Sequence, residues 1–180
     1  MLLIVVPEQE LFDEATETFY ITKEQTLRLE HSLVSISKWE SKWKKPFLSE
    51  GDKSQEEILD YVRCMTLTQN VDPMIYRSLS SDNVKEITDY INDKMTATWF
   101  SEDVTKRHSK EIITSEVIYA WMVQLNVPVE FEKWHINRLL TLIRVCSEMN
   151  KPPKQMSKRD IMARNNALNM QRRAKLHSRG

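Results

Sequence analysis

Few side chains in this sequence are spaced for metal binding or nucleophilic chemistry. Cys64 and Cys146 lie far apart and belong to no Cys-x-x-Cys pair, which favours free thiols over a disulfide. Zinc ligands cluster within a few residues of one another, whereas the four histidines are isolated: His31, His108, His135 and His177. On a shared helix, His135 and Cys146 would stand about 16 Å apart at a rise of ~1.5 Å per residue. We therefore expect no metal site and no cofactor.

Patterns for acid–base catalysis and phosphate binding are also missing. The adjacent carboxylates of Asp13 and Glu14 suit a solvated loop, and those of Glu56 and Glu57 suit a helix N-terminus. Cys64 has no neighbouring base in the sequence. The chain has two glycines in 180 residues and no Gly-x-Gly-x-x-Gly, P-loop or Gly-x-Ser-x-Gly motif, all of which need glycine for close backbone approach. We expect a protein without enzymatic activity.

Tryptophan placement suggests contacts rather than catalysis. Trp39 and Trp43 lie one helical turn apart within the charged stretch 37–45. Core packing is one interpretation. The other is an aromatic contact face for a protein partner, because tryptophan is enriched where interfaces concentrate their binding energy. Both residues are candidate partner-binding residues on this second interpretation, whereas Trp121 and Trp134 are expected in the core.

A formal net charge of zero conceals two oppositely charged segments. Residues 151–180 contain nine Lys or Arg residues and one acidic residue, for a net charge of +8, and residues 1–150 carry the balancing −8. The run Lys151-Pro152-Pro153-Lys154 separates them, since consecutive prolines stop a helix and favour an extended linker. We predict an acidic body over 1–150 and a Pro-linked basic helical tail over 151–180.

The tail pattern predicts a helix over 158–175, capped by Ser157. Its few apolar side chains cannot offset the entropy of ordering about twenty residues, so this helix should dock on something. The candidate partner-binding residues in the tail are Ile161, Arg164, Leu168, Arg172, Arg173 and Lys175. Three partners are open: an acidic body (its own or a neighbour's), a partner helix, and nucleic acid. Nucleic acid is disfavoured because the −8 body repels phosphate and the tail has no aromatic residue for base stacking.

The N-terminal pattern predicts a small β element. Alternating apolar and polar residues indicate strands over 2–6, 18–22 and 26–30, with an acidic loop between the first two. A further hairpin over 96–100 and 110–114 is indicated only weakly.

The pattern over the rest of the body predicts helices, so the expected fold class is mainly α (α+β). Caps are predicted at Ser32, at Ser54 (a capping box with Glu57) and at Asp82. Helix periodicity continues over 117–125 and 136–149, the second so broadly apolar that burial on more than one side is expected. The side chains expected to point inward from the second and third helices are Ile58, Leu59, Val62, Met65, Val84, Ile87 and Ile91.

No targeting or membrane-spanning segment is expected. Met1–Val6 is apolar, but it lacks a basic flank and Pro7 ends it too early for a signal peptide. No stretch approaches the ~18 consecutive apolar residues of a membrane helix. These features predict a cytosolic protein without membrane contact.

Four stretches resemble, as a set, a family of proteins from tailed bacteriophages and prophages of Gram-positive bacteria. They are Ser32–Leu48 (SLVSISKWESKWKKPFL), Ile58–Leu67 (ILDYVRCMTL), Lys133–Lys154 (KWHINRLLTLIRVCSEMNKPPK) and Met156–Leu176 (MSKRDIMARNNALNMQRRAKL). The family is that of the tail assembly chaperones of long-tailed phages.

The resemblance implies a role in assembly. Such a chaperone holds the long, helical tape-measure protein soluble while the tail tube polymerises, and then leaves, so it acts in the host cytoplasm and is absent from the mature virion. The resemblance further implies homo-oligomers or pairing with a longer frameshift product, and it supplies no catalytic residues. Two alternatives remain: a structural virion component, such as a head–tail or tail-completion protein, and a nucleic-acid-binding module that uses the basic tail.

Overall fold

The computed structural model describes residues 1–13, 17–49, 51–100, 112–152 and 157–176. The chain divides into two compact units, Met1–Ser147 and Glu148–Gly180. Six α-helices, two short 3-10 helices and four strands are found among the described residues. The mainly α fold with a small β element is thereby confirmed.

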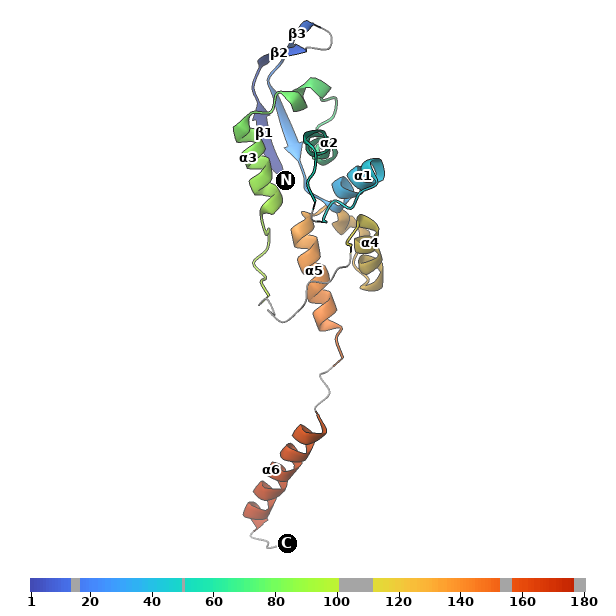
Figure 1. Cartoon of the computed structure of the whole chain (residues 1–180). Helices are drawn as coiled ribbons and strands as arrows, with labels where there is room; N and C mark the ends of the chain where they lie inside the picture. The colour runs from blue at the N-terminus through green and yellow to red at the C-terminus, as the bar shows by residue number, and fades with distance from the viewer. Residues whose placement is uncertain (14–16, 50, 101–111, 153–156, 177–180) are drawn as a thin grey trace. The chain divides into compact units, whose positions relative to one another are not determined.

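The β element is a hairpin within a hairpin (Figure 1). Strand β1 (Leu2–Val6) pairs antiparallel with β4 (Gln25–Leu29), and β2 (Gln9–Asp13) pairs antiparallel with β3 (Thr18–Thr22). Strand alternation sends one face of β1 and β4 into the core, through the side chains of Ile4, Val6, Leu27 and Leu29. The prediction of a loop over residues 9–13 is wrong. The acidic composition suggested a loop, but these residues form a strand because their backbone groups hydrogen-bond with β3.

The predicted caps at Ser32 and Ser54 are confirmed. Ser32 caps α1 (Leu33–Trp43) by accepting from the Ser35 amide, and Ser54 caps α2 (Gln55–Met65) by accepting from the Glu57 amide. The predicted inward stripe of α2 is partly wrong, because Ile58 is exposed whereas Tyr61 is buried. The buried face of α2 also carries two carboxylates, Glu57 and Asp60, which are held by side chains of α1 and its C-terminal loop.

Replacing Ser54 with alanine should lower the free energy of unfolding by about 1 kcal/mol, because the Glu57 amide loses its acceptor. Urea unfolding followed by circular dichroism measures the change. Ser81→Ala is the matched control, since Ser81 is an exposed first residue of a helix and not its cap. The control should change stability by less than about 0.5 kcal/mol, and an equal loss in both variants would contradict a capping role for Ser54.

Helix α3 (Ser81–Asn92) follows the 3-10 helix η1 (Pro73–Arg77) and packs against β1. Its cap is Ser80, not the predicted Asp82. Val84, expected to point inward, is exposed, because the buried positions are Asn83, Ile87 and Tyr90. The Asn83 amide donates to the Val5 carbonyl at 3.2 Å, so a polar side chain occupies the inward place beside the strand edge.

The weakly indicated hairpin over 96–100 and 110–114 is not formed by its described residues. Residues 96–100 and 112–114 are not strands, and residues 110 and 111 lie outside the described part of the chain.

Helices α4 (Ser115–Gln124) and α5 (Ile136–Met149), joined through η2 (Val129–Lys133), complete the first unit. Their buried side chains Ile118, Met122, Leu139 and Ile143 belong to the same core as α1 and the strands. The buried carboxylate of Glu40 accepts from the Ser115 amide at 2.7 Å and from the Phe47 amide at 2.8 Å. This carboxylate therefore ties α1 to the start of α4.

The second unit contains α6 (Lys158–Leu176). Its predicted cap is confirmed, since Ser157 accepts from the Asp160 amide at 3.1 Å. Every residue of α6 is exposed. Among the residues that the structure describes, no helix has both the length and the apolar character needed to span a membrane.

Candidate functional site

Trp39 is a core residue, not an exposed partner contact. Its side chain is 1 % exposed, and its indole nitrogen donates to the Glu57 carbonyl at 2.8 Å. The ring packs edge-on against Phe47, with centroids 5.2 Å apart, and Phe47 stacks on Tyr61. Trp39 is therefore not part of an exposed contact face, because the protein already covers its ring.

Trp43 is half-buried at the edge of the same aromatic group, and its polar atom is already engaged. Its indole nitrogen donates to Asp60 at 2.8 Å, and the Lys42 ammonium pairs with the same carboxylate at 2.5 Å. Burial acts to raise the pKa of Asp60, but the hydrogen bonds from Lys42 and Trp43 outweigh it and lower that pKa. Trp43 thus offers only part of its ring to solvent.

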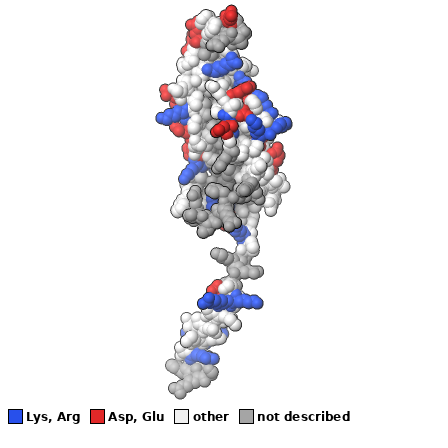
Figure 2. Space-filling view, in the orientation of Figure 1, with Lys and Arg blue, Asp and Glu red and all other residues white. Residues whose placement is uncertain are grey.

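Helix α6 brings five of the six predicted tail residues to one side. Ile161, Arg164, Leu168, Arg172 and Lys175 recur three, four or seven residues apart, which aligns them along one face of a helix. We call these five residues the α6 face. Arg173 lies away from it. The space-filling view shows basic side chains on this helix (Figure 2), so the face combines apolar contact with positive charge.

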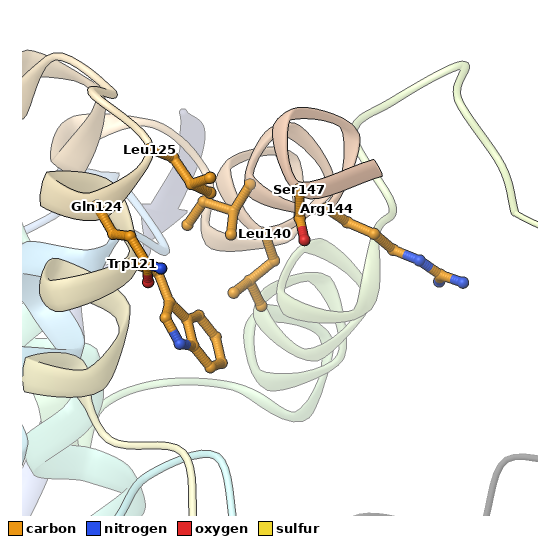
Figure 3. Close-up of a pocket in the computed structure, with 7 residues that line it drawn as sticks. Trp121, Gln124, Leu125, Leu140, Arg144 and Ser147 are labelled. Atoms are coloured by element: carbon orange, nitrogen blue, oxygen red, sulfur yellow. The ribbon is translucent and has the colours of Figure 1, made fainter. Parts of the chain in front are cut away.

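A groove lies between α4 and α5 and is a candidate binding surface that the sequence did not reveal (Figure 3). It is open to solvent and has a volume of about 360 Å³. The Trp121 indole and the Leu140 side chain point toward the same space from opposite helices. The remaining lining residues are Gln124, Leu125, Ile143, Arg144 and Ser147. Trp121, expected in the core, is half-buried and forms one wall.

The groove is apolar between its walls and polar at its rim. Gln124 and Ser147 lie at the rim, whereas Arg144 points away from Trp121 (Figure 3), its guanidinium 4.0 Å from the centre of the Phe100 ring. The apolar pattern of α5 was a partial signal for this site, since Leu140 and Ile143 belong to its main apolar stripe and both line the groove. No sequence signal placed Trp121 opposite that side. Such a surface suits apolar side chains of a partner helix.

His31 and His135 are buried between secondary-structure elements, and both imidazole rings are uncharged. Burial, reinforced by the neighbouring His135, lowers the pKa of His31 to about 3, and burial also lowers the pKa of His135. His135 Nε2 lies 2.9 Å from the Tyr90 carbonyl, which can only accept, and the Asn137 amide donates to His135 Nδ1 at 3.3 Å. Both contacts require the neutral ring with its proton on Nε2, so the hydrogen-bonding groups of His135 are satisfied within the protein.

The described residues give little support for metal binding or for thiol chemistry. No group of three or more His, Cys, Asp or Glu side chains there could hold a metal ion. Cys64 and Cys146 are both free thiols, as predicted, and burial raises the pKa of Cys64, which disfavours the reactive thiolate.

Comparison with models of known protein families finds no match for this chain. No curated protein matches it, and no solved structure does. The sequence resemblance and the two surfaces described above, the α4–α5 groove and the α6 face, therefore carry the functional proposal.

Proposed function

We propose that this protein is a tail assembly chaperone that binds helical segments of the phage tape-measure protein and keeps them soluble during tail assembly. The resemblance supports this role, and the four stretches that carry it overlap α1, α2, α5 and α6. The structural observation behind the proposal is the open apolar groove between α4 and α5. On this proposal the protein works in the host cytoplasm and is not part of the finished particle.

The groove suits a helical client for a physical reason. An amphipathic helix presents apolar side chains three and four residues apart, and a channel between two helices accepts such a row. Trp121 and Leu140 leave apolar surface half exposed on the two walls, so a client helix would remove this surface from water. The groove is open to solvent, which is compatible with a chaperone that must later release its client.

The test is co-expression with the tape-measure protein that the proposal expects to be encoded beside it, followed by co-purification. Ser147→Trp adds a large ring at an exposed position on the groove rim and should weaken the complex at least tenfold by occupying the client's place. Val123→Trp is the matched control, because Val123 is an exposed residue of α4 outside the groove lining. The control should bind as the unmodified protein does.

Two results would overturn the proposal. One is a tape-measure protein that stays soluble alone and forms no complex with this chain. The other is detection of this chain in purified virions by mass spectrometry, which would favour the structural-component alternative.

A further inference from the structure

The inner hairpin presents a mainly apolar face that the described residues of its unit leave uncovered. The exposed fractions of Phe12, Phe19 and Ile21 are 52 %, 67 % and 68 %. Phe12 pairs with Phe19 across the strands, and Glu10 pairs with Ile21, so alternation puts all four side chains on one side. We call these four residues the hairpin face. The two phenyl rings contact each other with centroids 4.9 Å apart.

This exposure is unusual for a small β element. A two-stranded hairpin is marginally stable by itself in water, and adjacent exposed aromatic residues on a protein surface mark a place where another surface docks. The hairpin face therefore fits a partner that covers Phe12 and Phe19 and supplies them with apolar contacts.

Charge restricts the kind of partner. Residues 8–24 contain six acidic residues and one basic residue, a net charge of −5. A phosphate-bearing or acidic partner would be repelled, whereas a basic one would be attracted. We therefore expect the partner surface to be apolar along its centre and to have basic residues next to that apolar centre.

The same chain carries a surface with these properties. Residues 158–176 contain six basic residues and one acidic residue, a net charge of +5. On the α6 face, Ile161 and Leu168 remain 45 % and 41 % exposed, and Arg164, Arg172 and Lys175 lie beside them. The two segments that carry these faces have equal formal charges of opposite sign, and each face exposes large apolar side chains.

We propose that the hairpin face of one copy binds the α6 face of a second copy. The interface joins two different surfaces, so every bound pair leaves one free hairpin face and one free α6 face, and further copies can add head to tail. The resemblance implies homo-oligomers but no contact surface, and the proposal assigns the two surfaces that join the copies.

The course of α5 favours a second copy over the hairpin of the same chain. The Ile136 amide donates to the His31 carbonyl, so α5 starts beside the end of β4, and it runs away from the hairpin (Figure 1). The chain therefore leaves the first unit at the end remote from the hairpin. Docking of α6 on its own hairpin would give a monomer whose mass does not change with concentration.

The experiment measures the mass of the full chain by light scattering and sedimentation over a range of concentrations, at low and high salt. The unmodified protein should form oligomers that grow with concentration and dissociate as salt screens the opposite charges. Phe12→Ser with Phe19→Ser, and separately Arg172→Glu with Lys175→Glu, should each weaken association at least tenfold. Trp99→Ser is the matched control, since Trp99 is 78 % exposed outside both faces, and it should associate normally.

Mixing the two defective proteins gives the sharpest test. Each retains the half of the interface that the other has lost, so the mixture should form a complex of two chains that does not grow further. Circular dichroism of each variant verifies that its helices are intact.

Three results would overturn this inference: a full chain that is monomeric at every concentration, defective variants that associate like the unmodified protein, or a mixture that does not combine. Association that disappears after nuclease treatment would also overturn it, because nucleic acid would then bridge the tails. Client binding is tested with a different variant, so its failure and the failure of self-association can be told apart.

Discussion

Replacing Trp39 with alanine should lower the free energy of unfolding by about 3–5 kcal/mol, as large-to-small changes in a close-packed core do. The indole is 1 % exposed and lies in the aromatic group with Phe47 and Trp43, so its removal leaves a cavity. The Glu57 carbonyl also loses the hydrogen bond from the indole nitrogen. A loss of this size is a large part of the stability of an ordinary domain.

Urea unfolding followed by circular dichroism measures this loss. Trp43→Ala provides the comparison on the same helix, because Trp43 is half-buried and its removal should cost about 1–2 kcal/mol. Equal losses in the two variants would contradict the assignment of Trp39 to the core and Trp43 to its edge. The result also separates folding from binding, since a partner contact at Trp39 would leave the stability of the free protein unchanged.

Acidification below about pH 6.5 should destabilise the protein by about 1.4 kcal/mol per pH unit through His31 alone. The folded-state pKa of His31 is about 3, whereas a histidine in the unfolded chain has a pKa near ~6.5. Between these values the unfolded chain takes up a proton that the folded protein does not, so stability falls as the pH falls. Above about pH 6.5 both states are neutral, and His31 contributes no pH dependence.

His135 acts in the same direction, because burial lowers its pKa although the carboxylates of Glu30 and Asp93 oppose the shift. Urea unfolding at pH 7.5, 6.5, 5.5 and 5.0 measures the combined slope. His31→Asn retains a hydrogen-bonding group near the Tyr61 hydroxyl but cannot be protonated, so this variant should lose about 1.4 kcal/mol per pH unit of that slope. A stability profile that is flat between pH 6.5 and 5.0 in the unmodified protein would rule out a neutral buried His31.

Local features of this protein could be predicted well from sequence. The caps Ser54 and Ser157 accept hydrogen bonds from amides three residues ahead, so a short stretch of sequence contains both partners of each bond. The strands over 2–6 and 18–22 were predicted from alternation for the same reason, because successive side chains of a strand point to opposite faces.

Features that depend on distant residues could not be predicted. Strand β2 is acidic and forms because β3 pairs with it. On α2, Ile58 and Tyr61 are comparable by periodicity, yet Tyr61 is buried because it meets His31, thirty residues away. The α4–α5 groove forms because Trp121 and Leu140 lie opposite each other on two helices. No pattern within either helix predicts that arrangement.

The sequence by itself determined the helical class, the caps Ser32, Ser54 and Ser157 and the division of charge between an acidic body and a basic tail. These properties depend on residue type and on neighbours within a few positions, so they can be read along the chain. Only the tertiary structure decided that Trp39 is covered while the hairpin face, the α6 face and the groove are not. Burial depends on what packs against a side chain from elsewhere in the molecule, and apolar surface left uncovered after that packing is what remains for partners.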